Sequence, residues 1–252
     1  MAISRTLVFP DRETLNRATA LFFAEATKEA ISERGRFLVS LSGGETPLVL
    51  FETLGRSPYR DYLPWKEIHI FWGDERCVPT DDPDSNYGQA WQYWLKNINI
   101  PVTNLHRIKG ELSASQAAEA YQQELKFFAL DGQDWPNLDW VLLGLGADGH
   151  TASIFPGSAL DMSPDQGAIA VHNATLGRLA DRVSLTPMLF NRSRQVVFMV
   201  SGSSKANALA ATRNNNSDPL NWPAQRIHPQ DGLLVWMVDK AASKGSLPFE
   251  KE

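Results

Sequence analysis

Two side chains able to transfer protons, Asp148 and His150, stand close together at the end of an apolar run. The run, residues 140–143, is short and continuous, as expected of a strand buried on both faces. Three glycines among the next six residues let the chain bend and approach a ligand closely. A carboxylate beside an imidazole can orient the ring and tune it as a general base. Of the five histidines, only His150 has such a setting, so we expect Asp148 and His150 to be catalytic.

Other chemistries fit this segment less well. Residues 144–149 match GxGxxG, but a dinucleotide fingerprint opens a long helix, and here Pro156 follows soon after. We therefore expect no nicotinamide cofactor. A metal site formed by Asp74, Asp148 and His150 is an alternative, although no HxxxH or CxxC spacing supports it. No GxSxG turn is present and the single cysteine has no neighbouring base, so we expect water activated by a side chain.

Two further turns have features of phosphate sites. The segment Ser-Gly-Gly-Glu-Thr-Pro at 42–47 ends at a predicted helix start, with Thr46 as N-cap and Pro47 at the first helical position. The free N–H groups there favour a phosphate. Residues 202–205 place a lysine at a second helix start, which is unfavourable unless an anion binds nearby. An ordinary turn and a solvated lysine are the alternatives. The candidate ligands are Ser42, Gly43, Gly44, Thr46 and Lys205.

The segment Asp74-Glu75-Arg76 puts two carboxylates and a guanidinium directly after a predicted strand. On an extended chain, Asp74 and Arg76 share one face and Glu75 points away. One interpretation has Asp74 facing substrate hydroxyls and Arg76 facing a phosphate. The other is a surface ion pair.

Strand and helix patterns alternate along the chain. The predicted strands are 6–9, 37–41, 68–72, 105–109, 140–143, 168–172, 182–185, 195–201 and 233–238. The predicted helices run from Asp11 to Gly35, from 46 to 54, through Trp91 and Leu95, from Ser113 or Ser115 through Phe128, and onward from Ala206.

This alternation predicts an α/β fold with three α/β/α layers and a mainly parallel, Rossmann-like sheet covered by helices on both faces. No linker or repeat divides the chain, so we expect residues 1–252 to form a single domain. In a parallel sheet the segments that follow strands meet at one edge, where ligands bind. The four glycine-rich or charged segments above all follow strands.

Composition narrows the partners. The 252 residues carry a formal net charge of −5, which argues against nucleic acid or an anionic membrane as the main partner. No apolar run has membrane-spanning length, and the single cysteine excludes an intrachain disulfide, so we expect a cytoplasmic protein. The oligomeric state stays open, and a monomer is compatible with the sequence.

Six segments in order along most of the chain resemble the 6-phosphogluconolactonases, in the superfamily that includes glucosamine-6-phosphate deaminase. They are LSGGETPL (41–48), FWGDERCVP (71–79), DSNYGQA (84–90), LGLGADGHTASIFPG (143–157), RVSLT (182–186) and SGSSKA (201–206). The resemblance implies hydrolysis of a small phosphorylated sugar lactone, 6-phospho-D-glucono-1,5-lactone, to 6-phospho-D-gluconate in the pentose phosphate pathway, with no cofactor or metal.

The resemblance also implies roles for the candidate residues. His150 would be the general base that activates water, Asp148 would fix its tautomer, and Asp74 would hold sugar hydroxyls or assist proton transfer. Gly43, Gly44 and Thr46 would cradle the 6-phosphate. Charge would come from Arg76, Arg182 and Lys205, and which of them meets the phosphate or the oxyanion stays open.

Deaminases are the main alternative. They typically carry a glutamate five residues after the histidine, where this chain has Phe155, and Met-Asp-Glu-Tyr where it has Gly-Asp-Glu-Arg. Both differences favour the lactonase. A sugar-phosphate sensor without catalysis is a second alternative, against which the Asp148–His150 pair counts.

Overall fold

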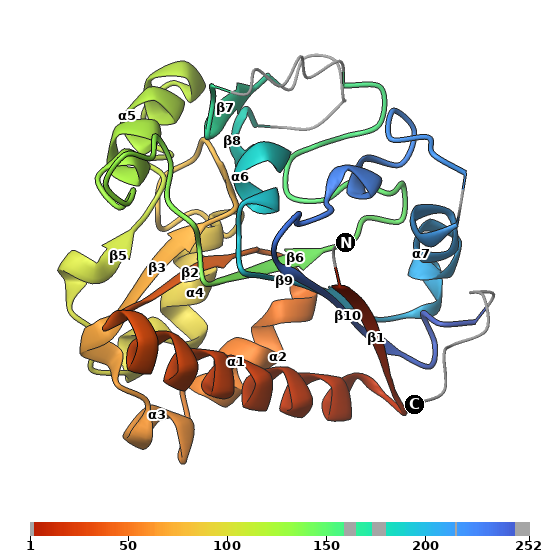
Figure 1. Cartoon of the computed structure of the whole chain (residues 1–252), viewed down its shortest axis with the longest axis horizontal. Helices are drawn as coiled ribbons and strands as arrows, with labels where there is room; N and C mark the ends of the chain where they lie inside the picture. Colours follow the sequence, from red (N-terminus) through yellow and green to blue (C-terminus); the bar gives the residue numbers. More distant parts are fainter. Residues whose placement is uncertain (1–2, 159–164, 173–179, 215, 245–252) are drawn as a thin grey trace.

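A computed structural model of the chain describes residues 3–158, 165–172, 180–214 and 216–244. Its main sheet has seven parallel strands in the order β1-β10-β9-β6-β2-β3-β5 (Figure 1). These strands are β1 Ile3–Phe9, β2 Phe37–Leu41, β3 Ile68–Trp72, β5 Leu105–His106, β6 Trp140–Gly144, β9 Gln195–Val200 and β10 Leu233–Asp239. The predicted parallel sheet is confirmed.

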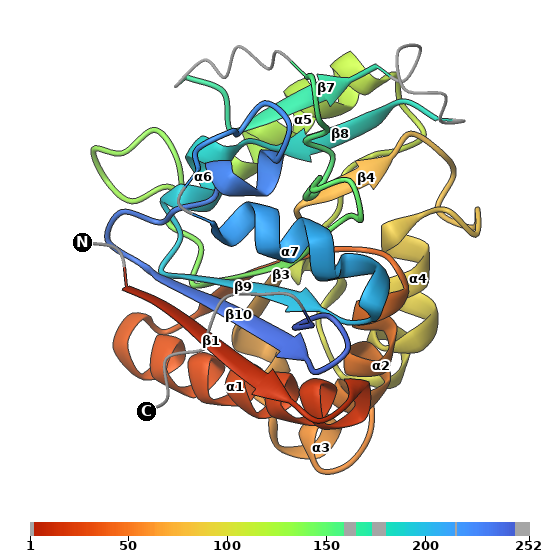
Figure 2. The ribbon, with the colours of Figure 1, turned by 90° about the vertical axis from the view of Figure 1, so that its right-hand side faces the viewer.

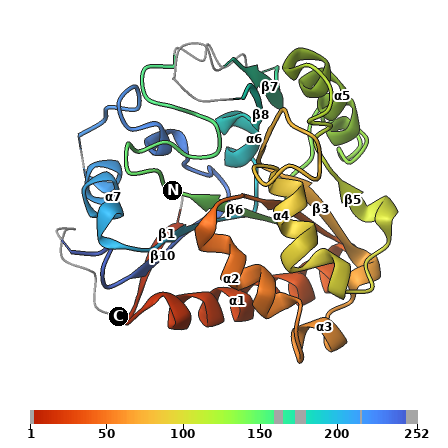
Figure 3. The same cartoon turned by 180° about the vertical axis from the view of Figure 1, so that it is seen from behind.

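Helices flank the main sheet, as predicted. Figures 1 and 2 show α1 and α2 on one face and α6 and α7 on the other, and α4 packs against α2 (Figure 3). The helices are α1 Arg12–Arg34, α2 Glu45–Leu54, α3 Tyr59–Tyr62, α4 Asn86–Tyr93, α5 Ala114–Lys126, α6 Pro187–Asn191 and α7 Ala206–Arg213. Short 3₁₀ helices span Trp65–Glu67, Leu95–Asn97, Val102–Asn104, Ser203–Lys205 and Pro223–Arg226. None of the described helices is both long and apolar enough to cross a membrane.

A second, antiparallel sheet packs against the helix α5. It has the order β4-β8-β7, with β4 Asp74–Arg76, β7 Ala168–Val171 and β8 Arg182–Leu185. Residues 74–76 were expected only to follow a strand, and β4 was not predicted from the sequence. A strand of three residues has no detectable period, and its partner β8 is distant in the sequence.

Helix ends mostly follow their local signals. Asp11 accepts the N–H of Thr14 at 2.7 Å and begins α1, and Gly35 ends it at φ 73°. Of the two serines proposed for α5, Ser113 is the N-cap. The prediction of Thr46 as an N-cap is wrong: the N-cap is Gly44, two residues earlier, and its φ of 100° suits no other residue type.

Other boundaries are shorter than predicted. The helix expected through Leu95 ends at Tyr93 and continues as a 3₁₀ turn, and the strand expected over 105–109 is a two-residue pair. Boundaries of this kind depend on which neighbouring strand supplies hydrogen bonds, which a local pattern does not reveal.

An aromatic cluster joins α1 to the main sheet. Phe23 of α1 is fully buried, and its ring meets Phe37 of β2 at 5.3 Å and Trp140 of β6 at 5.4 Å, both edge-on. Trp94, after α4, meets it at 6.0 Å. Edge-to-face pairs of this kind add to the energy of burial. The two strands held here, β2 and β6, are those whose ends carry the glycine-rich turns.

We therefore expect Phe23→Ala to lower the free energy of unfolding by about 3–5 kcal/mol, because it leaves a cavity among three aromatic rings. Phe127→Ala is the control, since that ring is 84% exposed and its removal changes stability by no more than about 0.5 kcal/mol. Urea unfolding of both variants measures the difference. Equal stabilities would contradict the assignment of this cluster as the core of the sheet.

Candidate active site

A cavity of about 390 Å³ opens where β2, β6 and β9 end, and β4 and β8 close one side. The parallel direction of the three strands brings the loops that follow them together, as predicted. All the candidate site residues except Asp148 line this cavity: Ser42, Gly43, Gly44, Thr46, Asp74, Arg76, His150, Arg182 and Lys205. Asp148 stands behind His150.

Asp148 and His150 contact each other directly. The distance between His150 Nδ1 and Asp148 Oδ1 is 2.5 Å, and the backbone N–H of His150 donates to the same oxygen at 3.2 Å. The turn that holds them depends on Gly146 and Gly149. The Gly146 N–H donates to the His150 carbonyl at 2.8 Å, and Gly149 has a φ of +82°.

The position of Gly146 has no room for a side chain. A Cβ there would lie 2.0 Å from His150 Nδ1 and 2.4 Å from Asp148 Oδ1. The glycine is therefore required by the close packing of Asp148 and His150, and not only by backbone flexibility.

The contact with His150 stabilises the ionised form of Asp148. Partial burial by itself raises the pKa of Asp148, but the hydrogen bond and the positive charge of His150 outweigh burial and lower the pKa below its usual value. The carboxylate is therefore ionised at neutral pH and accepts a hydrogen bond from the N–H of Nδ1. This arrangement selects the tautomer in which Nε2 carries the lone pair.

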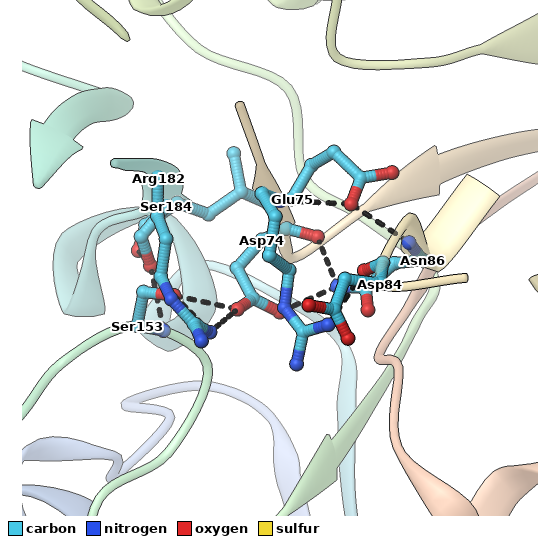
Figure 4. A network of polar contacts seen from close by, with 9 residues as sticks. Asp74, Glu75, Asp84, Asn86, Ser153, Arg182 and Ser184 are labelled. Atoms are coloured by element: carbon cyan, nitrogen blue, oxygen red, sulfur yellow. Dashed lines mark hydrogen bonds and ion pairs between the residues drawn. The ribbon is translucent and has the colours of Figure 1, made fainter. Parts of the chain in front are cut away.

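Asp74 is a buried acceptor and not part of a surface ion pair. It is 4% exposed, its Oδ2 accepts the Ser153 hydroxyl at 2.6 Å, and the guanidinium of Arg182 lies 3.7 Å away (Figure 4). The predicted shared face of Asp74 and Arg76 is confirmed, since both line the cavity and Glu75 does not. Arg76 donates to the backbone carbonyl of Asp84 at 2.5 Å.

Among the residues that were not predicted for the site, Asn86 and Arg12 line the cavity, and Ser153 contacts Asp74 beside it. Asn86, at the start of α4, donates from Nδ2 to the Asp74 carbonyl at 2.8 Å (Figure 4). Ser153 donates its hydroxyl hydrogen to Asp74 Oδ2. Arg12, the first residue of α1, lines the cavity and donates to the Glu45 carbonyl. Asn86 and Ser153 lie in two of the six segments that carry the family resemblance, but only tertiary packing brings them and Arg12 to the site.

The loop 42–46 presents the N-terminus of α2 to the cavity. The residue before α2, Gly44, has no side chain to cap the helix, so the first N–H groups of α2 lack a capping side chain. Lys205 ends the short 3₁₀ helix before α7 and lines the same cavity, as does Arg12. Two cations beside a helix N-terminus are a favourable environment for an anion.

The described residues offer neither a metal site nor a thiol nucleophile. They contain no group of three His, Cys, Asp or Glu side chains arranged to hold a metal ion. Burial raises the pKa of Cys77 to about 11, so this thiol is protonated at neutral pH.

Comparison with known proteins gives consistent matches. The family model described as glucosamine-6-phosphate isomerases/6-phosphogluconolactonase matches residues 10–236. A 6-phosphogluconolactonase of Synechocystis sp. is 42% identical over 236 residues, which is 93% of this chain and 94% of the relative. One from Haemophilus influenzae is 38% identical over 204 residues, which is 81% of this chain and 85% of the relative. The structure of the 6-phosphogluconolactonase of Trypanosoma brucei superposes with a TM-score of 0.83 at 26% identity, covering 97% of this chain and 99% of that one.

We expect Gly146→Ala to separate Asp148 from His150, because the new Cβ overlaps both side chains. The pKa of Asp148 should then rise, since burial remains while the hydrogen bond with His150 is broken. Carboxyl chemical shifts followed through a pH titration measure this change. Gly144→Ala is a matched control in the same turn, since a Cβ there meets nothing within 4 Å. An unchanged pKa of Asp148 in Gly146→Ala would show that this glycine does not hold the pair together.

Proposed function

The chain belongs to the glucosamine-6-phosphate isomerase and 6-phosphogluconolactonase family, and we propose that its site works as a lactonase through His150. The reaction is the hydrolysis of 6-phospho-D-glucono-1,5-lactone to 6-phospho-D-gluconate, a carboxylic ester hydrolysis in the pentose phosphate pathway. The observation that carries this assignment of residues is the Asp148–His150 contact in a cavity that also holds a phosphate-type loop.

In this proposal, His150 takes a proton from water as the water oxygen attacks the lactone carbonyl carbon. Nε2 performs this step, because Nδ1 faces the Asp148 carboxylate. The tetrahedral intermediate then breaks its bond to the ring oxygen. His150 returns the proton to that oxygen, so the ring opens and the free acid of the sugar is formed. Asp148 stabilises the imidazolium between the two steps.

The phosphate binds at the other end of the cavity. Gly43, Gly44 and Thr46 supply loop and helix N–H groups, and Lys205 supplies the charge. Ser42 forms part of the same loop. This assignment separates the group that anchors the substrate from the groups that react.

Asp74 and Arg182 lie between these two ends. Asp74 is held by Ser153 and Asn86, and is placed to accept a hydroxyl of the sugar ring. Arg182, 3.7 Å from Asp74, is placed to stabilise the oxyanion that develops on the carbonyl oxygen. Arg76, at the rim with Asp84, contributes positive charge to the entrance.

The position of Phe155 supports lactone hydrolysis over deamination. Its ring is 1% exposed and its centroid lies 4.9 Å from that of His150, where the deaminases typically carry a glutamate. An apolar ring at this place supplies no second acid or base beside the histidine. Release of ammonia from glucosamine 6-phosphate by the purified protein would overturn this choice.

The proposal also includes the domain organisation and the cellular location of the protein. We place both sheets in one domain, because β4 and β8 of the small sheet complete the cavity at the edge of the large one. A cytoplasmic location rests on the single cysteine, which excludes an intrachain disulfide.

The test of the proposed function is a coupled assay that generates the lactone in place and subtracts its spontaneous hydrolysis. The protein should accelerate formation of 6-phosphogluconate well above this background. Binding of 6-phosphogluconate without acceleration would indicate a sensor and would overturn the proposal.

For His150→Ala we expect kcat to fall roughly a hundred- to ten-thousand-fold, the usual contribution of a general base. KM should change little, because the phosphate ligands lie in other loops. Steady-state kinetics in the coupled assay measure both constants. A fully active His150→Ala variant would remove this residue from the mechanism.

For Lys205→Ala we expect mainly a rise in KM, because the charge that is removed binds the phosphate and does not take part in proton transfer. Lys240→Ala is the matched control, since Lys240 follows the neighbouring strand β10 but is exposed and is not among the residues that line the cavity. If Lys205→Ala keeps the wild-type KM, the phosphate binds elsewhere.

A further inference from the structure

Glu75 is a buried ionisable group that the proposed mechanism does not use. It stands between Asp74 and Arg76 on β4, but its side chain faces away from the cavity and the residue is only 2% exposed (Figure 4). A carboxylate in such a place is costly unless donors surround it.

Four donors converge on this carboxylate. Oε1 accepts the N–H of Arg76 at 2.8 Å and that of Asn86 at 2.7 Å. Oε2 accepts the N–H of Tyr87 at 2.8 Å and the hydroxyl of Ser85 at 3.1 Å. An ionised carboxylate satisfies all four, whereas a protonated one places its own hydrogen against a donor.

Glu75 therefore fixes the start of α4. The N–H groups of Asn86 and Tyr87, the first two residues of the helix, donate to the Glu75 carboxylate. The N–H of Gly88 donates to the hydroxyl of the N-cap Ser85 at 3.0 Å. The cap of this helix thus depends on a side chain from β4, in addition to its own N-cap residue.

Asn86 connects the start of α4 to the cavity. Its Nδ2 donates to the Asp74 carbonyl at 2.8 Å and approaches Asp74 Oδ1 at 3.3 Å. The Asp74 carbonyl can only accept a hydrogen bond, so the Nδ2 of Asn86 must face it and the orientation of the amide is fixed. Asn86 Oδ1 therefore faces Gly43, and a Cβ added at Gly43 would lie 1.8 Å from this oxygen. Asn86 therefore sets the spacing between Asp74 and the phosphate loop.

We propose that Glu75 is a positioning residue for substrate binding: when ionised, it holds Asn86 in the place that keeps Asp74 and Gly43 correctly spaced. The proposal rests on the proposed function, because it takes Asp74 and the loop of Gly43 as substrate ligands. It adds a requirement for a negative charge outside the cavity.

The surroundings of Glu75 make this requirement dependent on pH. Burial raises the pKa of Glu75 to about 7, although three backbone N–H groups lower it, and the charge of Asp74 raises it further. The charged and titratable groups that face it are Asp74 and Arg76 of β4, Cys77, Arg107 and Tyr121 of α5. Ionisation of Glu75, and with it the spacing of the site, is therefore lost as the pH falls through about 7.

The experiment measures binding of 6-phosphogluconate by calorimetry between about pH 8 and pH 6, in proteins that lack the imidazole of His150. From about pH 8 to pH 6, the affinity of His150→Ala should fall about tenfold more than that of His150→Ala/Glu75→Gln. The reason is that one pH unit below the pKa of Glu75 only about a tenth of this carboxyl group is ionised. Protonation of the ligand phosphate, near pH 6, is common to both proteins and cancels. The double variant should bind weakly throughout.

Two further variants make the outcome decisive. The first combines His150→Ala with Asn86→Ala, which removes the link between α4 and Asp74 but keeps the Glu75 carboxylate. It should remove the same tenfold pH dependence of the affinity, so the test stays valid if Glu75→Gln fails to fold. Adding Glu119→Gln, an exposed site on α5, should leave the dependence unchanged. Equal pH dependence in all these proteins would overturn the proposal. Absence of lactone hydrolysis by the wild type would instead overturn the proposed function.

Discussion

The parallel direction of β2, β6 and β9 is the constraint on which the site depends. Because the three strands run the same way, the loops after them meet at one edge, and each loop delivers a different group. The loop after β2 presents a helix N-terminus, that after β6 presents Asp148 and His150, and that after β9 presents Lys205. Reversing any one strand would carry its loop to the opposite edge of the sheet.

The small antiparallel sheet supplies the side of the cavity that the parallel sheet leaves open. β3 ends at Trp72, and two residues later the chain enters β4, which pairs with β8 and turns Asp74 into the cavity beside Arg182. Asp74 is thus held from three directions, by β8, by Ser153 and by Asn86. A carboxylate this deeply buried needs such fixed partners, because an unpaired one would take up a proton instead.

Local signals predicted the parallel strands, the helix end at Gly35 and the candidate residues that line the cavity, while the roles assigned to those residues stay predictions. These features are encoded by residues close in sequence, such as an apolar run followed by glycines. The strand β4, Asn86 and Arg12 were missed, because each joins the site only through contacts with distant segments. The N-cap of α2 was predicted two residues too late, at Thr46, because a glycine at positive φ, Gly44, lets the helix begin earlier.

The distribution of charge explains how a chain of net charge −5 could accept an anionic substrate. Each carboxylate at the reacting end already faces a positive or proton-donating partner, Asp74 with Arg182 and Asp148 with His150, so its field is locally balanced. At the loop end, Lys205 joins the positive terminus of α2. In the proposed function, the phosphate is therefore attracted mainly to the end of the cavity that Lys205 and α2 form. In the proposed binding mode, the same separation of charge orients the carbonyl of the substrate toward His150.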